Sequence, residues 1–374
     1  MADDPEGMLS WDESVFRNEH VFEVDYLPET FHHRESQLES LKYALRPAVR
    51  GSRPLNTMIR GPPGTGKTTA VQKLFGELGG KSDIEVVRVN CQVDSTRYAV
   101  FSRLFEGVFE YEPPASGISF KKLFGQLTDR LVEEETVLVV ALDDINYLFY
   151  ENEAGDTLYS LLRAHEVHSG AKIGVIVVSS DLSLDVIDDL DGRVQSVFRP
   201  EEIYFPRYST DEIASILRER VTRGFHEGVI GSPELDTVVE YTADSGDLRV
   251  GIDLLRRAGL HAEMRASRTV TDEDIDAAYE KSKHVHLSRS LEGLSESERA
   301  LIEVLVAHDG KQAGEVYEAF SEETGLGYTR YSELVNKLDQ LGLITATYAD
   351  VDGRGRSREL SLDYETDAIV DRLE

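Results

Sequence analysis

The feature that most limits how this chain folds is the run GPPGTGKT at residues 61–68, which fits the pattern G-x-x-x-x-G-K-[S/T]. The run follows a short apolar stretch, NTMIR, and precedes a run with helical spacing, TTAVQKLFGEL. In that setting the glycines let backbone N–H groups face a phosphate, and the helix start adds the positive end of its dipole. The pattern predicts a phosphate-binding loop rather than a chance glycine turn.

The residue types in this loop indicate a nucleotide with its metal ion. Lys67 is expected to reach the β- and γ-phosphates, and Thr68 is expected to hold Mg²⁺. The predicted cofactors are therefore ATP or ADP with Mg²⁺. The whole loop is predicted to bind the nucleotide, and its residues are Gly61, Pro62, Pro63, Gly64, Thr65, Gly66, Lys67, Thr68 and Thr69.

A second candidate for catalysis is the acidic end of the apolar run VLVVALDD, residues 137–144. An apolar strand ending in Asp143 suits the acid that binds Mg²⁺ in a P-loop ATPase. Asp144 follows at the position where many such enzymes place a glutamate that orients the attacking water. The alternative, two merely solvated acids at a strand end, is less favoured after a phosphate loop.

The apolar patterns divide the chain into three parts. From about residue 56 to 205, short apolar strands alternate with helical stretches, which indicates a parallel sheet with crossover helices. From about 207 to 285 the pattern predicts helices, with starts at Ser209/Thr210, at Ser232 and after Thr271. Residues 287–374 show three helical stretches and then strand, glycine turn and strand, which is the outline of a winged helix.

The charge balance bears on the type of organism and on whether nucleic acid is a partner. The chain has 70 acidic and 40 basic residues among 374, a formal net charge of -30, which resembles proteins of salt-loving organisms. Such acidity argues against nucleic acid as a partner, but less so at molar salt, where the Debye length is about 3 Å. An acidic N-terminus and the lack of a long apolar run predict a soluble cytoplasmic protein without a membrane contact.

One loop departs from this acidity. The stretch ADVDGRGRSREL, residues 349–360, has Arg354, Arg356 and Arg358 at alternate positions around Gly353 and Gly355, and is predicted to be the turn between the two wing strands. Arginines on a glycine-rich turn suit a phosphodiester chain or a minor groove. The alternative is a solvated hairpin. The recognition helix is expected to start near Tyr328, and the side chains predicted to face DNA at its start are Thr329, Arg330, Tyr331 and Ser332, with a packing role for Tyr331 equally open.

Taken in order, these motifs resemble the archaeal replication initiators related to origin recognition complex subunit one and cell division control protein six. The likeness covers nearly the full length, including Tyr26-Leu27-Pro28 and His33-Arg34-Glu35, which match the segment that faces adenine. The resemblance implies an α/β AAA+ P-loop ATPase base, an α-helical lid and a C-terminal winged-helix domain that binds DNA. The expected bounds are 1–205, with residues 1–50 near adenine, then 206–286 and 287–374.

The resemblance also assigns roles outside the loop. Arg193, in DGRVQSVFRP, matches the arginine that is offered to a neighbouring nucleotide or used near the site, and Arg249, in GDLRVG, matches the lid arginine that senses the γ-phosphate. The alternative for either arginine is a surface ion pair. Tyr208 is expected beside the nucleotide. Three positions depart from the family pattern: Asp144 replaces a glutamate, Asn146 a carboxylate, and Ser180 an asparagine that contacts the γ-phosphate. Because a misplacement of about 1 Å can cost roughly 100-fold in rate, slow hydrolysis is expected.

The implied function is that of an ATP-binding initiator. Its expected partners are double-stranded origin DNA, the replicative helicase that it recruits or loads, and further copies of itself on DNA. Two other classes stay open. One is a nucleotide-switched DNA-binding regulator that does not load a helicase. The other is a clamp-loader-like remodelling ATPase whose winged helix binds protein, against which the arginines of the wing argue.

Overall fold

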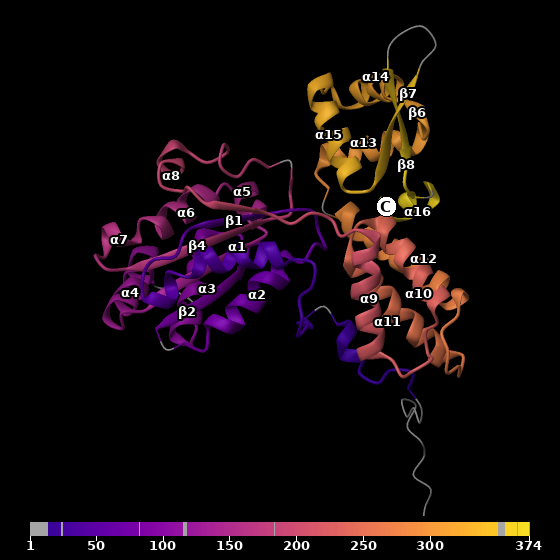
Figure 1. The fold of residues 1–374 in the computed structure, drawn as a ribbon. Helices are drawn as coiled ribbons and strands as arrows, with labels where there is room; N and C mark the ends of the chain where they lie inside the picture. The colour runs from indigo at the N-terminus through magenta and orange to yellow at the C-terminus, as the bar shows by residue number, and fades with distance from the viewer. Residues whose placement is uncertain are drawn as a thin grey trace, which may run out of the picture. The chain divides into compact units, whose positions relative to one another are not determined.

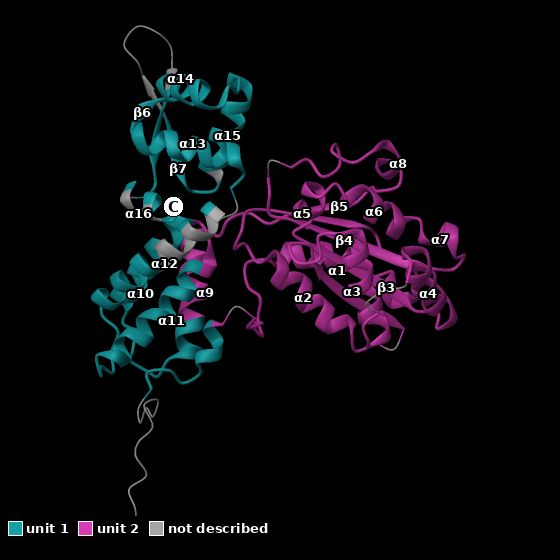
Figure 2. Cartoon of the chain, turned by 180° about the vertical axis from the view of Figure 1, so that it is seen from behind, with its two compact units in different colours: residues 1–22, 220–245, 250–374 teal, residues 23–219, 246–249 magenta. Residues whose placement is uncertain are grey.

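The computed structural model describes residues 14–23, 25–81, 83–114, 118–182, 184–292, 294–350, 356–364 and 366–373. The chain divides into two compact units, coloured separately in Figure 2. One unit contains Glu23–Glu219 and Gly246–Arg249. The other contains Met1–Phe22, Arg220–Ser245 and Val250–Glu374.

The first unit is built on the predicted parallel sheet (Figure 1), which is confirmed and has five strands in the order β2-β3-β4-β1-β5. Strands β1 and β3 lie in the apolar runs NTMIR and VLVVALDD, as predicted. The bounds of the five strands are β1 Thr57–Arg60, β2 Ile84–Asn90, β3 Val137–Asp143, β4 Lys172–Ser179 and β5 Glu201–Tyr204. Because the strands are parallel, the carboxyl ends of β1 and β3 meet at one edge of the sheet, and that edge carries the site.

Both faces of this sheet are covered, which explains why β3 is apolar at every position before its acid. Val137, Val139 and Ala141 pack in one core cluster with α1 (Glu35–Leu45) and α2 (Lys67–Leu78). The alternate residues Leu138, Val140 and Leu142 pack on the other face. Helices α3 Arg97–Phe109, α4 Phe120–Glu133, α5 Asn146–Tyr150 and α6 Ala154–Leu162 supply that second core, while α7 Ala164–Val167, α8 Gly192–Gln195 and η2 Ala48–Arg50 complete the unit.

Four helices follow the sheet, in the region that the sequence predicts to be helical. They are α9 Thr210–Gly224, α10 Ser232–Ser245, α11 Leu248–Met264 and α12 Asp272–Glu292. The predicted starts are confirmed, since α9 begins at Thr210, α10 begins at Ser232, and α12 begins one residue after Thr271. The N–H of Thr271 donates to Asp274 Oδ2 at 3.0 Å, which fixes the first turn of α12.

The first described residues pack on these helices, through aromatic rings. Phe16 and Phe22, the latter at the end of η1 (Glu19–Phe22), place their ring centroids 4.9 and 4.8 Å from that of Phe225. A Cβ at Gly224 would lie 2.2 Å from the Phe22 ring, and one at Gly259 2.4 Å from Phe16. Glycines thus make room for the rings, so burial of aromatic surface decides the path of this segment.

The C-terminal part contains the predicted helices and strands in the predicted order. Helices α13 Glu296–Ala307, α14 Ala313–Thr324 and α15 Tyr328–Gln340 are followed by strands β7 Ile344–Asp350 and β8 Arg356–Leu362. A short strand β6 (Lys311–Gln312) and a last helix α16 (Thr366–Leu373) were not predicted. The three strands form an antiparallel sheet in the order β6-β8-β7, and Ser295 and Glu298 form a capping box at α13.

Helix α12 continues through residue 286, where the sequence predicts a domain boundary. Ile275 and Ala278 in its first half are buried, and Leu287 and Leu291 in its second half belong to the C-terminal core cluster. One helix therefore contributes to both cores, which explains why they fall in one compact unit. Within the described residues, no helix is both long enough and apolar enough to cross a membrane.

Candidate nucleotide-binding site and nucleic-acid interface

The loop between β1 and α2 has the backbone that its glycines predict. Gly64 and Gly66 have φ angles of 69° and 88°, in the left-handed region that glycine adopts without strain. Gly66 is the residue from which α2 begins, so the first turn of this helix follows the loop directly. Thr65 Oγ1 donates to Pro62 O at 2.9 Å and ties the loop together, while Pro63 is exposed and Thr69 is half-buried.

Lys67 lies inside the loop and not on the surface. Its side chain is buried, and Nζ donates to the carbonyl oxygens of Gly61 and Pro62, both at 2.7 Å. Burial lowers the pKa of Lys67 to about 8, since desolvation disfavours the charged form. A buried ammonium at the mouth of a loop of backbone N–H groups is suited to binding phosphate oxygens.

The predicted metal ligands are brought together. Thr68 Oγ1 lies 3.3 Å from Asp143 Oδ1, although the two residues are 75 positions apart. The second oxygen of Asp143, Oδ2, accepts a hydrogen bond from Arg88 Nη1 at 2.9 Å. A hydroxyl and a carboxylate are the hard oxygen ligands that Mg²⁺ prefers, so these residues fit the ion. Burial and then the neighbouring Asp144 raise the pKa of Asp143, while Arg88 acts in the opposite direction.

Two positions that depart from the family pattern contact each other. Ser180 Oγ donates to Asp144 Oδ1 at 3.2 Å, which joins the residue after β4 to the residue after β3. Asp144 has a φ of 54°, an uncommon backbone conformation for a residue with a side chain. Asn146, the third departure, is buried at the start of α5.

The predicted sensor arginine lies beside the loop. Arg249 Nε donates to Asp247 Oδ1 and Oδ2, both at 3.0 Å. A Cβ at Gly64 would meet Asp247 Oδ1 at 1.9 Å, so the carboxylate is packed directly on the loop. The hydrogen-bonded Asp247 raises the pKa of Arg249, and Asp144 also raises it.

Tyr208 is also placed at the loop. A Cβ at Gly66 would lie 2.9 Å from both the Tyr208 hydroxyl and Phe31 Cζ. The Tyr208 ring is in turn packed against Arg34, whose Cζ lies 3.7 Å from the ring centroid. Arg34 is 2% exposed and donates to the carbonyl oxygens of Thr65 at 3.1 Å and of Pro206 at 2.7 Å. This buried arginine fixes the loop to the chain segment that carries Tyr208.

Arg193 is not part of this group within the described residues. Its Nη2 donates to Asp191 Oδ2 at 2.8 Å and lies 4.0 Å from Asp156 Oδ1, and its Cζ lies 5.4 Å from the Tyr159 ring centroid. The side chain is 65% exposed. Such a position at a surface is compatible with the predicted role toward a neighbouring copy.

The residues predicted to face DNA in the C-terminal part differ in their exposure to solvent. Thr329 and Arg330 are exposed in the first turn of α15, and Ser332 is half-buried. Arg330 Nη1 pairs with Glu333 Oε2 at 3.0 Å. Arg358 on β8 donates to Asn336 Oδ1 at 2.7 Å, which joins the hairpin to α15.

Two arginines of the predicted wing lie at least partly outside the described residues, and Tyr331 takes the packing role rather than the DNA-facing role that was also predicted for it. Arg354 lies outside the described residues, as does the side chain of Arg356, whose backbone is in β8. Tyr331 is 1% exposed, and its hydroxyl donates to Ala313 O at 2.8 Å. Its place in the core, rather than toward DNA, follows from its packing against Tyr317 and Phe320.

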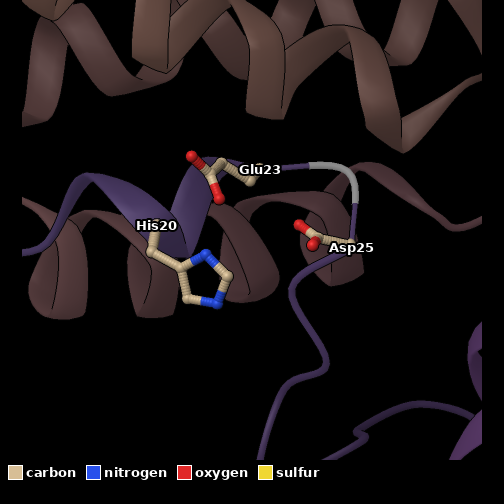
Figure 3. A group of neighbouring side chains, drawn as sticks. All are labelled: His20, Glu23 and Asp25. Atoms are coloured by element: carbon tan, nitrogen blue, oxygen red, sulfur yellow. The ribbon is translucent and has the colours of Figure 1, made fainter.

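Figure 3 shows one more group with the spacing of metal ligands, formed by His20, Glu23 and Asp25. Their ligand atoms all lie within 4.8 Å of one another. The segment joins the two units, and its side chains are exposed or half-exposed. Exposed acidic groups of this kind are common without a metal ion, so we assign it no function.

Comparison with known proteins gives this geometry a family. Residues 30–178 match the model of an AAA ATPase domain, and residues 214–280 match the model of a Cdc6 AAA+ ATPase-type lid domain. ORC1-type DNA replication protein 3 of Haloarcula marismortui is 72% identical over 375 residues, which cover 100% of both chains. The protein 6 of that type from Halobacterium salinarum is 67% identical over 374 residues, again covering 100% of both chains. The chain belongs to the ORC1-type DNA replication proteins.

Solved structures agree with this assignment of the ORC1-type chain. The Aeropyrum pernix ORC1 protein, solved in complex with DNA, superposes with a TM-score of 0.72 at 26% identity and covers 97% of each chain. The ORC2 protein of the same organism, solved as ADPNP and ADP complexes, gives a TM-score of 0.73 at 22% identity over 96% of this chain and 98% of the other, and shows the fold alone. The predicted resemblance to the archaeal replication initiators is therefore confirmed. The two relatives named above come from halophiles, as the acidic composition predicts.

Sequence reasoning missed two arginines of the ORC1-type site. Arg88 sits in β2, where the register places Asn90 beside Asp143 and so brings Arg88 within reach of the acid. A basic residue between the valines of this strand is the signal that could have identified it. Arg34 was recognised only as part of a family pattern, and no sequence feature shows that it is buried against Thr65 and Tyr208.

Proposed function

We propose that this ORC1-type protein is an ATP-binding replication initiator that grips duplex origin DNA and helps to recruit or load the replicative helicase. The observation that carries the proposal is the group formed by buried Lys67, Thr68 and Asp143 on a chain of this family. We divide it into a base, residues 1–205, a lid, 206–286, and a winged-helix domain, 287–374.

In the proposed site each side chain has one role toward the nucleotide. Loop residues 61–69 surround the β- and γ-phosphates, and Lys67 contributes a positive charge from inside the loop. Thr68 and Asp143 would hold Mg²⁺, which when bound neutralises charge on the phosphate oxygens. Arg249 faces the γ-phosphate from the lid side, and Tyr208 lies beside the loop.

Slow hydrolysis is part of the proposal. Asp144 is expected to orient the attacking water, but its shorter side chain is also hydrogen-bonded to Ser180. Ser180 stands where an asparagine would contact the γ-phosphate, and its hydroxyl is directed to Asp144 instead. Both observations support a protein that retains its nucleotide for a long time and turns it over slowly. Arg193, exposed on α8, would complete the site of a neighbouring copy on DNA.

The proposed DNA-binding surface is the start of α15 with the β7–β8 hairpin. Thr329 and Arg330 are exposed there, with Ser332 behind them, and Arg358 is fixed to α15 through Asn336. Arg354 and Arg356 belong to the same predicted wing. The likeness to an ORC1 protein solved with DNA supports this role, and the clustering of arginines on a chain of net charge -30 supports it independently.

A second candidate is a nucleotide-switched DNA-binding regulator that does not load a helicase. The Asp144–Ser180 contact favours it, because a protein that only switches between nucleotide states has little need of turnover. The two candidates differ in one property. An initiator should retain the replicative helicase on origin DNA in an ATP-dependent way, and a regulator should not.

The test is selection of fragmented genomic DNA by the purified full chain in molar potassium chloride. We expect the wild type to select a few repeated sites. Arg354→Ala/Arg356→Ala and Arg358→Ala should lose that selection. Arg103→Ala removes an exposed arginine from α3 and serves as the matched control. Failure of the wild type to select any DNA would overturn the proposal and favour the protein-remodelling alternative.

A further inference from the structure

Two arginines of the proposed machinery are each held by an aspartate two residues earlier. The backbone N–H of Arg193 donates to Asp191 Oδ1 at 2.8 Å, and its Nε donates to the same oxygen at 3.2 Å. The backbone N–H of Arg249 donates to Asp247 Oδ1 at 2.9 Å, and its Nε to the same oxygen at 3.0 Å. Asp-x-Arg at a helix start thus forms the same local clamp twice.

The clamp at Arg249 differs in what it faces. Asp247 packs on the phosphate loop, because a Cβ added to Gly64 would come within 1.9 Å of Asp247 Oδ1 and 2.9 Å of its Cα. The positive charge of Arg249 lowers the pKa of Lys67, and the negative charge of Asp144 raises the pKa of both residues. The held guanidinium therefore lies among the side chains that surround the expected phosphate position. The clamp at Arg193 lies beside Tyr159 and Asp156 instead.

The geometry of the clamp leaves part of the arginine available. Asp247 accepts from Nε and Nη2, which form one edge of the planar guanidinium. The other edge, with Nη1, is the one that can meet a phosphate oxygen. The backbone N–H of Arg249 shares the Asp247 carboxylate, so much of its negative charge is compensated before a phosphate arrives.

We propose that Asp247 is a positioning residue that holds Arg249 ready for the γ-phosphate, so that the protein distinguishes nucleoside triphosphate from diphosphate. This inference rests on the proposed nucleotide-binding function of residues 61–69. A free arginine side chain loses rotational freedom about several bonds when it binds a phosphate. The arginine held by Asp247 has already lost most of that freedom, so its binding costs less conformational entropy. The carboxylate near the loop also repels phosphate, but its pairing with Arg249 reduces that effect for both nucleotides alike.

The test compares affinities of the full chain for ADP and for a non-hydrolysable ATP analogue, measured by fluorescence titration. We expect Asp247→Ala to reduce the ratio of triphosphate to diphosphate affinity about tenfold, which equals about 1.4 kcal/mol. The ADP affinity should change by no more than about threefold, because ADP has no γ-phosphate for Arg249 to meet. Asp253→Ala removes another aspartate–arginine pair on α11, at 2.6 Å from Arg257, and should leave the ratio unchanged.

A double-mutant cycle separates positioning from direct charge effects. If Asp247 acts through Arg249, Asp247→Ala should have no further effect on the ratio in an Arg249→Ala background. An increase in the ratio, an equal loss for both nucleotides, or a full effect in that background would each overturn the inference. Asp247→Asn, which keeps the size of the side chain, replaces Asp247→Ala if the alanine variant does not fold. A wild type that binds neither nucleotide would overturn the proposed function itself.

Discussion

Ser180 Oγ lies 3.2 Å from Asp144 Oδ1, so two positions at which this chain departs from its family pattern contact each other. Each side chain is shorter than the one that the pattern expects. A shorter carboxylate and a shorter polar group can meet in this way without either reaching a nucleotide. The two departures are thus one structural change, and they should be reversed together.

The first prediction follows from this contact. Asp144→Glu/Ser180→Asn should raise the rate of ATP hydrolysis at least about tenfold over the wild type. Each single change should lower the activation free energy by less than half as much as the double change does. Single-turnover hydrolysis at constant molar salt measures it, with Lys67→Ala as a variant that should show no activity. A wild-type rate near one per second, or a double variant no faster than the wild type, would contradict the prediction.

The second prediction concerns Gly66. Its φ is 88°, and a Cβ added there would lie 2.9 Å from Phe31 Cζ and from the Tyr208 hydroxyl, which leaves no room for a side chain. Gly66→Ala should destabilise the protein by roughly 1–3 kcal/mol and abolish nucleotide binding. Gly76→Ala, on α2 with no neighbour within 4 Å, should instead stabilise it by about 0.5–1 kcal/mol. Chemical unfolding and calorimetric titration measure both effects.

The third prediction tests the corrected role of Tyr331. Tyr331→Phe removes the hydrogen bond to Ala313 O and leaves this half-buried carbonyl with one donor fewer. We expect a loss of about 1 kcal/mol in unfolding free energy, because a buried hydrogen bond contributes about that much. DNA affinity should stay the same, whereas Arg330→Ala should reduce it. A Tyr331→Phe protein of normal stability with weakened DNA binding would restore the original interpretation.

The fourth prediction concerns pH. Glu298 Oε1 lies 2.8 Å from Lys337 Nζ, and Glu298 is 3% exposed. Burial alone would raise the pKa of Glu298, but the hydrogen bonds from Lys337 and Ser295 outweigh it, and the net shift is downward from 4.5. A folded-state pKa below the unfolded value gives stability that is present above about pH 4.5 and lost as the pH falls through the folded pKa.

Glu298→Gln should therefore destabilise the protein by roughly 2 kcal/mol at pH 7 and by progressively less toward pH 3. Thermal unfolding of both proteins across this range, at fixed salt, measures the difference. Lys337→Met is the matched control, since it leaves the buried carboxylate without its cation and should be more costly near pH 7 than near pH 3. A difference independent of pH would show that Glu298 contributes through packing alone.

The parts predicted from sequence are those set by periodicity and by glycine. The five strands and the loop at 61–68 follow from apolar runs and from the backbone angles that only glycine adopts freely. The polar partners could not be predicted, because a hydrogen bond between Arg88 and Asp143, or between Arg34 and Thr65, depends on tertiary distances. Leu341 shows the limit of periodicity itself: its spacing predicts a core residue, but it caps the end of α15 and is 44% exposed.

Helix α12 has a mechanical consequence. It runs without a break from Asp272 to Glu292, a length of about 30 Å, and buries its two ends in different cores. A continuous helix resists twisting and offers no hinge at the point where a flexible linker would bend. We therefore expect α12 to act as a rigid link, so that any rotation of the helices packed on its first half would also move the helices and strands packed on its second half.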